Sequence, residues 1–358
     1  MRSSSGFADF AIGDFGMKKR FFIVIIVIVV LAIILGINHR AVDLVFKNIT
    51  VEKLPLPKVE NWNGGTAYLE VPYSDISENT HLNLYVPNSE ETPQLFVLIH
   101  GGGFIFGDSE TEQIQRIYSY FRDHGYACAS INYRLAQEAA FPAAVDDCKA
   151  AIRFLRANAE KYGYNADKIA VYGESAGGYL ALMCAVTSDE DFHGVSYVGQ
   201  EEKAVTADVD VLVEYYGYSS LTGLEEDLKA IGLPKLVFTF ANSWTFGNLM
   251  GYEDYGSAFF RKNISQMTEA ELNERDPLFY LEKNSRELSG RLDAYLIHGD
   301  SDITIPLPSS IRLEKAFAET LGEEHVFLRI ESGMGHASDP LYKDAVLAEV
   351  DEFIKSHE

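Results

Sequence analysis

The sequence predicts a protein of the α/β class, with a mostly parallel central sheet and helices on both faces of that sheet. From residue 95 onward, short apolar runs alternate with stretches of helical periodicity, as they do when parallel strands are buried on both faces. Glycine, serine, aspartate and histidine directly follow several of these runs, which is where sheets of this class bind ligands. These two observations predict both the fold class and the edge of the sheet that carries the site.

The elements follow from these patterns in chain order. The segments Thr66–Tyr73 and His81–Val86 alternate apolar and polar residues, which predicts two half-buried antiparallel strands. The predicted buried strands are Leu95–Ile99, Ala127–Asn132, Ile169–Tyr172, Val211–Tyr215, Ala294–Ile297 and Val326–Ile330. The predicted helices are Pro142–Tyr162, Ala176–Val186, Pro308–Leu321 and Leu341–Ser356, two of which start with the proline that favours a first helical position.

One stretch interrupts this alternation. Residues from about 217 to 290 are far too many for an ordinary connection between a strand and a helix, so they predict a helical cap insertion. The stretch is rich in aromatic residues, which either form the apolar wall of a lid over a pocket or pack the insertion onto the body. The sequence leaves both alternatives open.

Composition excludes several classes of protein. The 358 residues include 30 Lys and Arg against 53 Asp and Glu, a net charge of −23, with 47% apolar and 23% charged residues. Such a composition is typical of a globular chain rather than a disordered one. An acidic body would be repelled by phosphates, so nucleic-acid binding is not expected as the main function.

The first 40 residues differ from the rest of the chain. Residues 21–37, FFIVIIVIVVLAIILGI, carry no polar side chain and would form a helix roughly 25 Å long, enough to span the apolar core of a bilayer. The basic cluster Lys18-Lys19-Arg20 predicts that the tail 1–20 stays in the cytoplasm and that the body 41–358 is extracytoplasmic. A single-pass cell-membrane protein with a signal anchor at 21–37 is therefore expected. The alternatives are secretion after signal cleavage, for which no good A-x-A site is present, and a buried core helix.

The first chemical motif is Gly173-Glu174-Ser175-Ala176-Gly177-Gly178, between a predicted strand and a predicted helix. Glycines at 173 and 177 let strand and helix approach closely around a strained serine, which projects Ser175 Oγ above the sheet. The start of the helix also places the Ala176 N–H where an oxyanion would form. The alternative is a glycine-rich turn that serves packing alone.

The second motif is His100-Gly101-Gly102-Gly103, which directly follows the strand Leu95–Ile99. Successive glycines let backbone N–H groups turn toward a ligand without interference from a Cβ atom. Acyl transfer needs such donors because the attacked carbonyl oxygen becomes an anion. His100 lies on the strand side of the glycines and is expected to brace the loop rather than act as a base.

Two late motifs supply an acid and a base. Asp302 lies in His298-Gly299-Asp300-Ser301-Asp302, and His336 in Gly333-Met334-Gly335-His336, each after a predicted strand. A serine hydroxyl needs an imidazole to take its proton, and the imidazole needs a carboxylate that fixes its tautomer. The order Ser175, Asp302, His336 therefore predicts a catalytic triad, with Asp300 and Asp339 as rival acids. The remaining histidines are expected to be structural or surface residues.

The three cysteines, Cys128, Cys148 and Cys184, show no spacing of a zinc site and are expected to act as small apolar residues. No motif calls for a metal or a cofactor.

These motifs together resemble the hormone-sensitive-lipase-like carboxylesterases and acetylesterases of the α/β-hydrolase fold. The similarity rests on HGGGFIFGD at 100–108, NYRLAQEAAFPAAVDD at 132–147, GESAGG at 173–178, HGDSD at 298–302 and GMGHA at 333–337. It implies that Ser175 is the nucleophile, His336 the base and Asp302 its orienting acid. It also implies that Gly102, Gly103 and Ala176 form the oxyanion hole, with His100, Gly101, Gly173, Glu174 and Gly177 in support. The chain departs from the family pattern in its amino-terminal anchor and its long insertion, both of which affect substrate choice.

The expected activity is hydrolysis of small to medium esters, such as acetyl or other short-chain acyl esters, through an acyl-enzyme. Two alternatives remain. One is a serine peptidase or amidase, because HGDSD also resembles prolyl-oligopeptidase-like enzymes, although no propeller domain is present. The other is a non-catalytic binding protein on a hydrolase scaffold, tethered at the cell surface.

Overall fold

The computed structural model of the chain describes residues 64–192, 195–200, 204–220, 223–232, 259–262 and 266–357. The predicted membrane anchor at 21–37 and the basic tail 1–20 lie outside these residues. Among the helices within the described ranges, none has the length and apolar character needed to span a bilayer.

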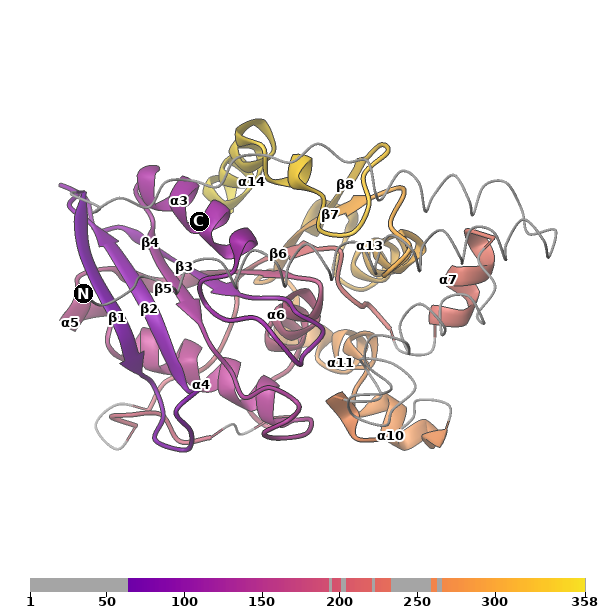
Figure 1. The fold of residues 1–358 in the computed structure, drawn as a ribbon, viewed down its shortest axis with the longest axis horizontal. Helices are drawn as coiled ribbons and strands as arrows, with labels where there is room; N and C mark the ends of the chain where they lie inside the picture. The colour runs from indigo at the N-terminus through magenta and orange to yellow at the C-terminus, as the bar shows by residue number, and fades with distance from the viewer. Residues whose placement is uncertain are drawn as a thin grey trace, which may run out of the picture.

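The described strands form one eight-stranded sheet in the order β1-β2-β4-β3-β5-β6-β7-β8 (Figure 1). β2 pairs antiparallel with both β1 and β4, and every other neighbouring pair is parallel. The strands are β1 (Gly65–Pro72), β2 (His81–Pro87), β3 (Gln94–Ile99), β4 (Ala127–Ile131), β5 (Asn165–Glu174), β6 (Val211–Tyr215), β7 (Asp293–Gly299) and β8 (Val326–Glu331). The predicted mostly parallel sheet is thus confirmed, with each predicted strand present. The largest shift is in β5, which starts at Asn165, where its pairing with β3 is irregular.

Helices cover both faces of the sheet, as predicted. The main ones are α3 (Glu112–Asp123), α4 (Ala143–Ala157), α5 (Ala159–Tyr162), α6 (Ala176–Val186), α13 (Pro308–Thr320) and α14 (Asp344–Ser356). One apolar core joins the sheet to α3 and α14, for example through Phe96 and Phe121, whose ring centroids are 4.6 Å apart. The core on the other face joins the sheet to α4, α6 and α13. Figure 1 shows α3 and α14 on one side of the strands and α4 and α6 on the other.

Two predicted helices are divided in the structure. The stretch predicted as Pro142–Tyr162 breaks at Asn158, whose side-chain amide donates to the Phe154 carbonyl at 2.8 Å and so ends α4. The stretch predicted as Leu341–Ser356 breaks at Lys343, whose extended backbone separates the 3₁₀ helix η3 (Asp339–Tyr342) from α14. Pro142 is the residue before α4 rather than its first residue.

The helix α3 was not among the predicted elements, although its sequence carries the pattern. Its buried side chains include Ile114, Ile117, Tyr118 and Phe121, which recur at the three- and four-residue spacing of one helix face. The helix follows the glycine loop at 100–107 and so connects that loop to the second layer of the fold.

The described parts of the insertion at about 217–290 are helical. They are α7 (Leu224–Ala230), α10 (Glu269–Asn273), α11 (Pro277–Lys283) and α12 (Ser285–Leu288). Of the aromatic residues in the stretch, Phe259 and Phe260 are buried against the body. Six further aromatic residues of the insertion lie outside the described residues: Phe238, Phe240, Trp244, Phe246, Tyr252 and Tyr255.

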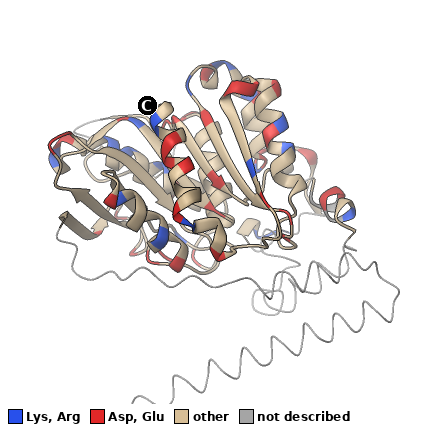
Figure 2. Cartoon of the chain, turned by 90° about the horizontal axis from the view of Figure 1, so that it is seen from above, with Lys and Arg blue, Asp and Glu red and all other residues tan. Residues whose placement is uncertain are grey.

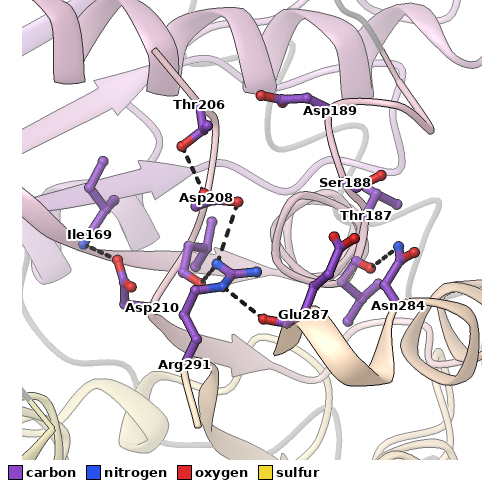
Figure 3. Close-up of polar contacts among 12 residues, drawn as sticks. Ile169, Thr187, Ser188, Asp189, Thr206, Asp208, Asp210, Asn284, Glu287 and Arg291 are labelled. Atoms are coloured by element: carbon purple, nitrogen blue, oxygen red, sulfur yellow. Dashed lines mark hydrogen bonds and ion pairs between the residues drawn. The ribbon is translucent and has the colours of Figure 1, made fainter. Parts of the chain in front are cut away.

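A polar network lies at the end of the sheet where β6 starts (Figure 3). Asp210 accepts a hydrogen bond from the Ile169 N–H at 2.8 Å, which joins β6 to β5. Arg291 donates to the Val209 carbonyl at 2.7 Å and lies 3.7 Å from Asp208. These contacts attach the last residues of the insertion to the sheet, at the edge opposite the carboxyl ends of the parallel strands.

Charged side chains of both signs are distributed over the described surface. Figure 2 shows Lys and Arg residues interspersed with Asp and Glu residues along the outer helices and loops. Some of these charges meet in ion pairs, such as Arg153 with Asp189 and Lys355 with Asp351, both at 2.7 Å.

Candidate active site

Ser175 occupies the sharp turn between β5 and α6, with φ 54° and ψ −118°. A non-glycine residue with this backbone conformation stores roughly 1–3 kcal/mol of strain, which the surrounding packing must hold. Two glycines make that packing possible. A Cβ on Gly173 would lie 2.1 Å from the Gly177 carbonyl oxygen, and one on Gly177 would lie 2.2 Å from the Ile99 carbonyl oxygen. No side chain fits at either position, so β5, α6 and β3 meet only because both residues are glycine.

The structure brings Ser175, His336 and Asp302 together from three separate loops. His336 Nε2 lies 2.9 Å from Ser175 Oγ, and His336 Nδ1 lies 2.7 Å from Asp302 Oδ2. A carboxylate beside Nδ1 keeps the proton of the neutral imidazole on that nitrogen, so Nε2 is free to accept the Ser175 hydroxyl proton. The three side chains form a continuous hydrogen-bonded chain at the carboxyl edge of the sheet, in which the proton moves between Ser175 and His336 while Asp302 orients the imidazole.

Asp302 is held firmly in this arrangement. Its Oδ1 accepts hydrogen bonds from the N–H groups of Thr304 (2.7 Å) and Ile305 (3.0 Å). Burial favours the neutral acid, but the charge of His336 and the hydrogen bonds from His298 and His336 outweigh it, so the pKa of Asp302 lies well below its usual range. Asp302 is therefore ionised at neutral pH.

The buried His298 supports this carboxylate. Its Nε2 lies 2.8 Å from the Ile305 carbonyl oxygen and 3.4 Å from Asp302 Oδ2, and its Nδ1 lies 2.7 Å from Ser310 Oγ. These contacts give His298 the structural place that the sequence predicted for it.

The rival acids occupy other positions. Asp300 accepts a hydrogen bond from the Gly333 N–H at 2.7 Å and so ties the two late loops together. Asp339 is buried, with Arg116 Nη2 3.8 Å from its carboxylate. Of the three candidate acids, Asp302 has the short contact with His336 Nδ1.

The glycine loop lies across from Ser175. Gly102 and Gly103 adopt φ values of 113° and 61°, and a Cβ on Gly102 would lie 2.0 Å from the Phe106 carbonyl oxygen. The Gly102 carbonyl accepts the N–H groups of Ile105 and Phe106, both at 3.2 Å, which closes the loop into a tight turn. Gly102, Gly103 and Ala176 line the same cavity as Ser175 and His336. This placement suits N–H donors directed at a carbonyl oxygen attacked by Ser175.

His100 braces this loop. It is buried, its ring stacks on Tyr133 with 4.3 Å between ring centroids, and its carbonyl accepts the Tyr133 hydroxyl at 2.9 Å. Burial lowers the pKa of His100 to about 4, although its hydrogen bond to Gly101 opposes the shift. The ring is therefore neutral and structural near pH 7.

Glu174 links the glycine loop to Tyr216, whose ring lies against His336. One carboxylate oxygen accepts the Gly101 N–H at 2.9 Å, and the other accepts the Tyr216 hydroxyl at 3.0 Å. Burial raises the pKa of Glu174, and the hydrogen bond from Gly101 and the charge of His336 only partly offset it. The Tyr216 hydroxyl also shares a short hydrogen bond with that of Tyr342.

The cavity above Ser175 has a volume of about 330 Å³. Its wall is partly apolar and partly polar, and the residues beyond the predicted site that line it are Phe104, Phe106, Gly107, Thr111, Gln113, Tyr218, Thr304, Ile305 and Ala337. Sites for small molecules start at about this size, so the space suits a small ligand.

Tyr216, which lies beside His336 and Glu174, was not among the predicted site residues. Its ring lies edge-on to His336, with 4.8 Å between ring centroids. Tyr216 directly follows β6, and its position after a buried strand is the signal that could have revealed it. Tyr218, two residues later, lines the cavity for the same reason.

The described residues contain no group of three or more His, Cys, Asp or Glu side chains arranged to hold a metal ion. The three cysteines are buried and free, and no disulfide joins them.

The chain is similar to known esterases over part of its length. It is 28% identical over 189 residues to "Probable carboxylic ester hydrolase LipM" of Mycobacterium tuberculosis, which covers 52% of this chain and 42% of the relative. It is 33% identical over 122 residues to "Acetyl esterase" of Salmonella paratyphi B, covering 34% of this chain and 36% of the relative. The chain thus spans less than half the length of these curated relatives.

The fold itself is shared with solved structures. A truncated carbohydrate esterase from gut microbiota superposes with a TM-score of 0.68 at 21% identity, covering 85% of this chain and 99% of that one. The carboxylic ester hydrolase and the acetyl esterase named above confirm the predicted resemblance to esterases. The solved structure confirms the fold.

A family model matches a longer part of the chain than the single relatives do. The family model named BD-FAE matches residues 82–317, about two thirds of the 358 residues. The matched range starts in β2, includes the glycine loop, Ser175 and Asp302, and ends in α13, so it contains most of the site described above. The chain belongs to the BD-FAE family.

Proposed function

We propose that the chain is a serine carboxylic-ester hydrolase that works through an acyl-enzyme on Ser175. The observation that carries the proposal is the unbroken path from Asp302 Oδ2 through His336 to Ser175 Oγ, with contacts of 2.7 and 2.9 Å. The esterase relatives support the same reaction class.

In the first half of the reaction, Ser175 Oγ attacks the ester carbonyl carbon while His336 Nε2 accepts the hydroxyl proton. The carbonyl oxygen becomes an anion that faces the N–H groups of Gly102, Gly103 and Ala176. His336 then gives its proton to the departing alcohol, which leaves the acyl group on Ser175. In the second half, His336 Nε2 takes a proton from water as the water oxygen attacks the acyl carbon. The bond between that carbon and Ser175 Oγ then breaks, and His336 returns the proton to Oγ, which releases the free acid.

We further propose that the substrates are small to medium esters with acetyl or other short acyl groups. The cavity of about 330 Å³ is at the lower end of the range for ligand sites, which favours short acyl groups. We also propose that the insertion at about 217–290 forms a lid over this cavity, because its many aromatic residues would give the pocket an apolar wall.

The proposed activity is tested with matched ester and amide substrates. We expect the 358-residue chain to hydrolyse p-nitrophenyl acetate faster than p-nitrophenyl octanoate, and acetyl p-nitroanilide slowest, because the cavity is small and an amine is a poorer leaving group than an alcohol. The measurement is kcat/KM for each substrate. No hydrolysis of any ester above the buffer rate would refute the function, and a preference for the anilide would indicate an amidase.

The pH dependence of this activity follows from the charges around His336. Burial favours the neutral imidazole, but the charge of Asp302, its hydrogen bond and the charge of Glu174 outweigh it, so the pKa of His336 is raised. The neutral form is the base, so kcat/KM should fall as the pH drops through a value above the usual histidine pKa of about 6.5. Glu174→Gln keeps an acceptor for the Gly101 N–H and removes a negative charge that raises the pKa of His336. The acidic limb of the pH profile of kcat/KM should therefore move to lower pH in this variant. An unmoved limb would contradict the account of His336.

We also propose that residues 21–37 anchor the chain in the cell membrane, with the catalytic body on the extracytoplasmic side. The support is the apolar run of 17 residues behind Lys18-Lys19-Arg20. Protease treatment of intact cells tests this placement, since an extracytoplasmic body should be degraded and a cytoplasmic one protected.

A further inference from the structure

The residue that follows the glycines of the oxyanion loop, Phe104, contacts the insertion. Its backbone is left-handed, with φ 66°, and its ring is 3% exposed. The ring stacks on that of Phe259, with 4.1 Å between centroids and 10° between planes. Phe259 is completely buried and belongs to the insertion between β6 and β7. A distant segment of the chain therefore packs directly on the loop that faces Ser175.

Phe259 is itself fixed in place by neighbours outside the loop. Its carbonyl accepts the Phe141 N–H at 3.1 Å, and the rings of Phe141 and Phe260 lie 5.8 and 5.1 Å from its ring. The guanidinium of Arg275 lies over Phe141 at 5.0 Å and over Phe260 at 5.7 Å. Phe259 thus presents a rigid flat surface rather than a mobile side chain.

Phe104 also contacts the body of the protein, and Tyr179 there is in ring contact with both Phe104 and Phe259. Tyr179 on α6 meets the Phe104 ring edge-on, with 5.6 Å between centroids and 87° between planes. The Phe104 carbonyl accepts the Ala136 N–H at 2.8 Å. The Gly102 carbonyl accepts hydrogen bonds from the Ile105 and Phe106 N–H groups, which closes the turn around Phe104. A shift of the Phe104 ring would therefore displace the N–H groups of Gly102 and its neighbour Gly103.

We propose that Phe259 is a positioning residue for the oxyanion loop. Its ring holds Phe104 against Tyr179, and Phe104 in turn holds the N–H groups of Gly102 and Gly103 at the distance from Ser175 that the developing anion requires. Phe259 does not line the catalytic cavity, so it acts through Phe104 and not on the substrate. The proposal rests on the proposed esterase function and gives part of the insertion a role in the rate of the reaction.

The test is a double-mutant cycle of Phe259→Leu and Phe104→Leu, two substitutions that keep an apolar side chain of similar bulk. We expect each single variant to lower kcat for p-nitrophenyl acetate about tenfold, because donors aimed at an oxyanion lose much of their effect when displaced. Phe259→Leu should change KM less than twofold, because Phe259, unlike Phe104, does not line the cavity. The double variant should lose no more than the stronger single one, since both changes break the same contact. Additive losses would overturn the proposal.

Phe192→Leu is the matched control. Phe192 is buried in the same aromatic cluster, 5.8 Å from Phe141 and 5.6 Å from Tyr280 between ring centroids, but it has no ring contact with Phe104. This variant should lose as much thermal stability as Phe259→Leu and keep the wild-type kcat. Equal kcat in Phe259→Leu and Phe192→Leu would show that Phe259 only fills space. Should Phe259→Leu fail to fold, Phe259→Met replaces it in the cycle with the same expected result.

A second readout separates this proposal from the proposed function. The rate constant for phosphonylation of Ser175 by a fluorophosphonate also depends on donors aimed at the phosphoryl oxygen, and it needs no ester turnover. We expect it to fall about tenfold in Phe259→Leu and to be unchanged in Phe192→Leu. An unchanged rate in Phe259→Leu would refute the positioning role. Wild-type labelling without ester hydrolysis would refute the esterase function alone.

Discussion

Replacing Ser175 with alanine is expected to lower kcat for ester hydrolysis about 10⁶-fold, to the residual rate that the oxyanion loop and binding alone provide. His336→Ala should fall to the same residual rate, because a serine hydroxyl without its base is as inert as no hydroxyl. The double variant should be no slower than either single one, since the two side chains act as a unit across the 2.9 Å contact of Ser175 Oγ with His336 Nε2. The measurement is kcat with p-nitrophenyl acetate for all three variants.

The control for these variants is His298→Asn, which removes an imidazole that lies beside Asp302 but does not contact Ser175. His298 Nε2 lies 3.4 Å from Asp302 Oδ2, so its loss should weaken the support of the acid by a modest factor. A loss as large as that of His336→Ala would mean that the wrong histidine has been assigned as the base. If the factors by which Ser175→Ala and His336→Ala lower kcat multiplied in the double variant, the two side chains would not act in the same step.

Asp302→Asn is expected to lower kcat about 10⁴-fold while leaving the fold intact. The Thr304 and Ile305 N–H groups bind Oδ1, so an asparagine would keep its carbonyl oxygen there and turn its NH₂ group toward His336 Nδ1. An NH₂ donor at Nδ1 favours the tautomer with its proton on Nε2. That tautomer has no lone pair for the Ser175 hydroxyl proton, so the base is lost although the ring stays in place.

Asp300→Asn is the matched control, because it makes the same chemical change two residues away. The Asp300 carboxylate accepts hydrogen bonds from the Gly333 N–H and the Ser332 hydroxyl. It is Asp302, and not Asp300, that contacts His336 Nδ1. We expect this variant to lose some thermal stability and less than tenfold in kcat. The reverse order, with Asp300→Asn more damaging to kcat than Asp302→Asn, would exclude Asp302 as the orienting acid.

The strands could be predicted from the sequence because their signal is local and strong. Residues Leu95–Ile99 are fully buried, and only a strand covered on both faces needs such a run. The positions of Ser175, Asp302 and His336 could be predicted for a related reason, since each follows a strand and the carboxyl ends of parallel strands share one edge. The glycines at 173 and 177 predicted that backbone segments approach closely there. In the structure, Gly173 lies against the Gly177 carbonyl and Gly177 against the Ile99 carbonyl.

The parts that could not be predicted depend on contacts between distant segments. Nothing near Phe259 in the sequence indicates that its ring stacks on Phe104, because 154 residues separate them. The same holds for Tyr216, whose hydroxyl meets Glu174 from a different strand. The break at Lys343 is also not marked by a glycine or a proline at that position.

Covalent labelling tests most directly whether Ser175 is a nucleophile activated by His336 and Asp302. The 358-residue chain is treated with a fluorophosphonate at neutral pH, and the modified peptide is identified by mass spectrometry together with the rate of labelling. We expect one adduct per chain, on Ser175, with a labelling rate that falls by several orders of magnitude in His336→Ala. An adduct on another residue, or the same rate of labelling with and without His336, would contradict these assignments.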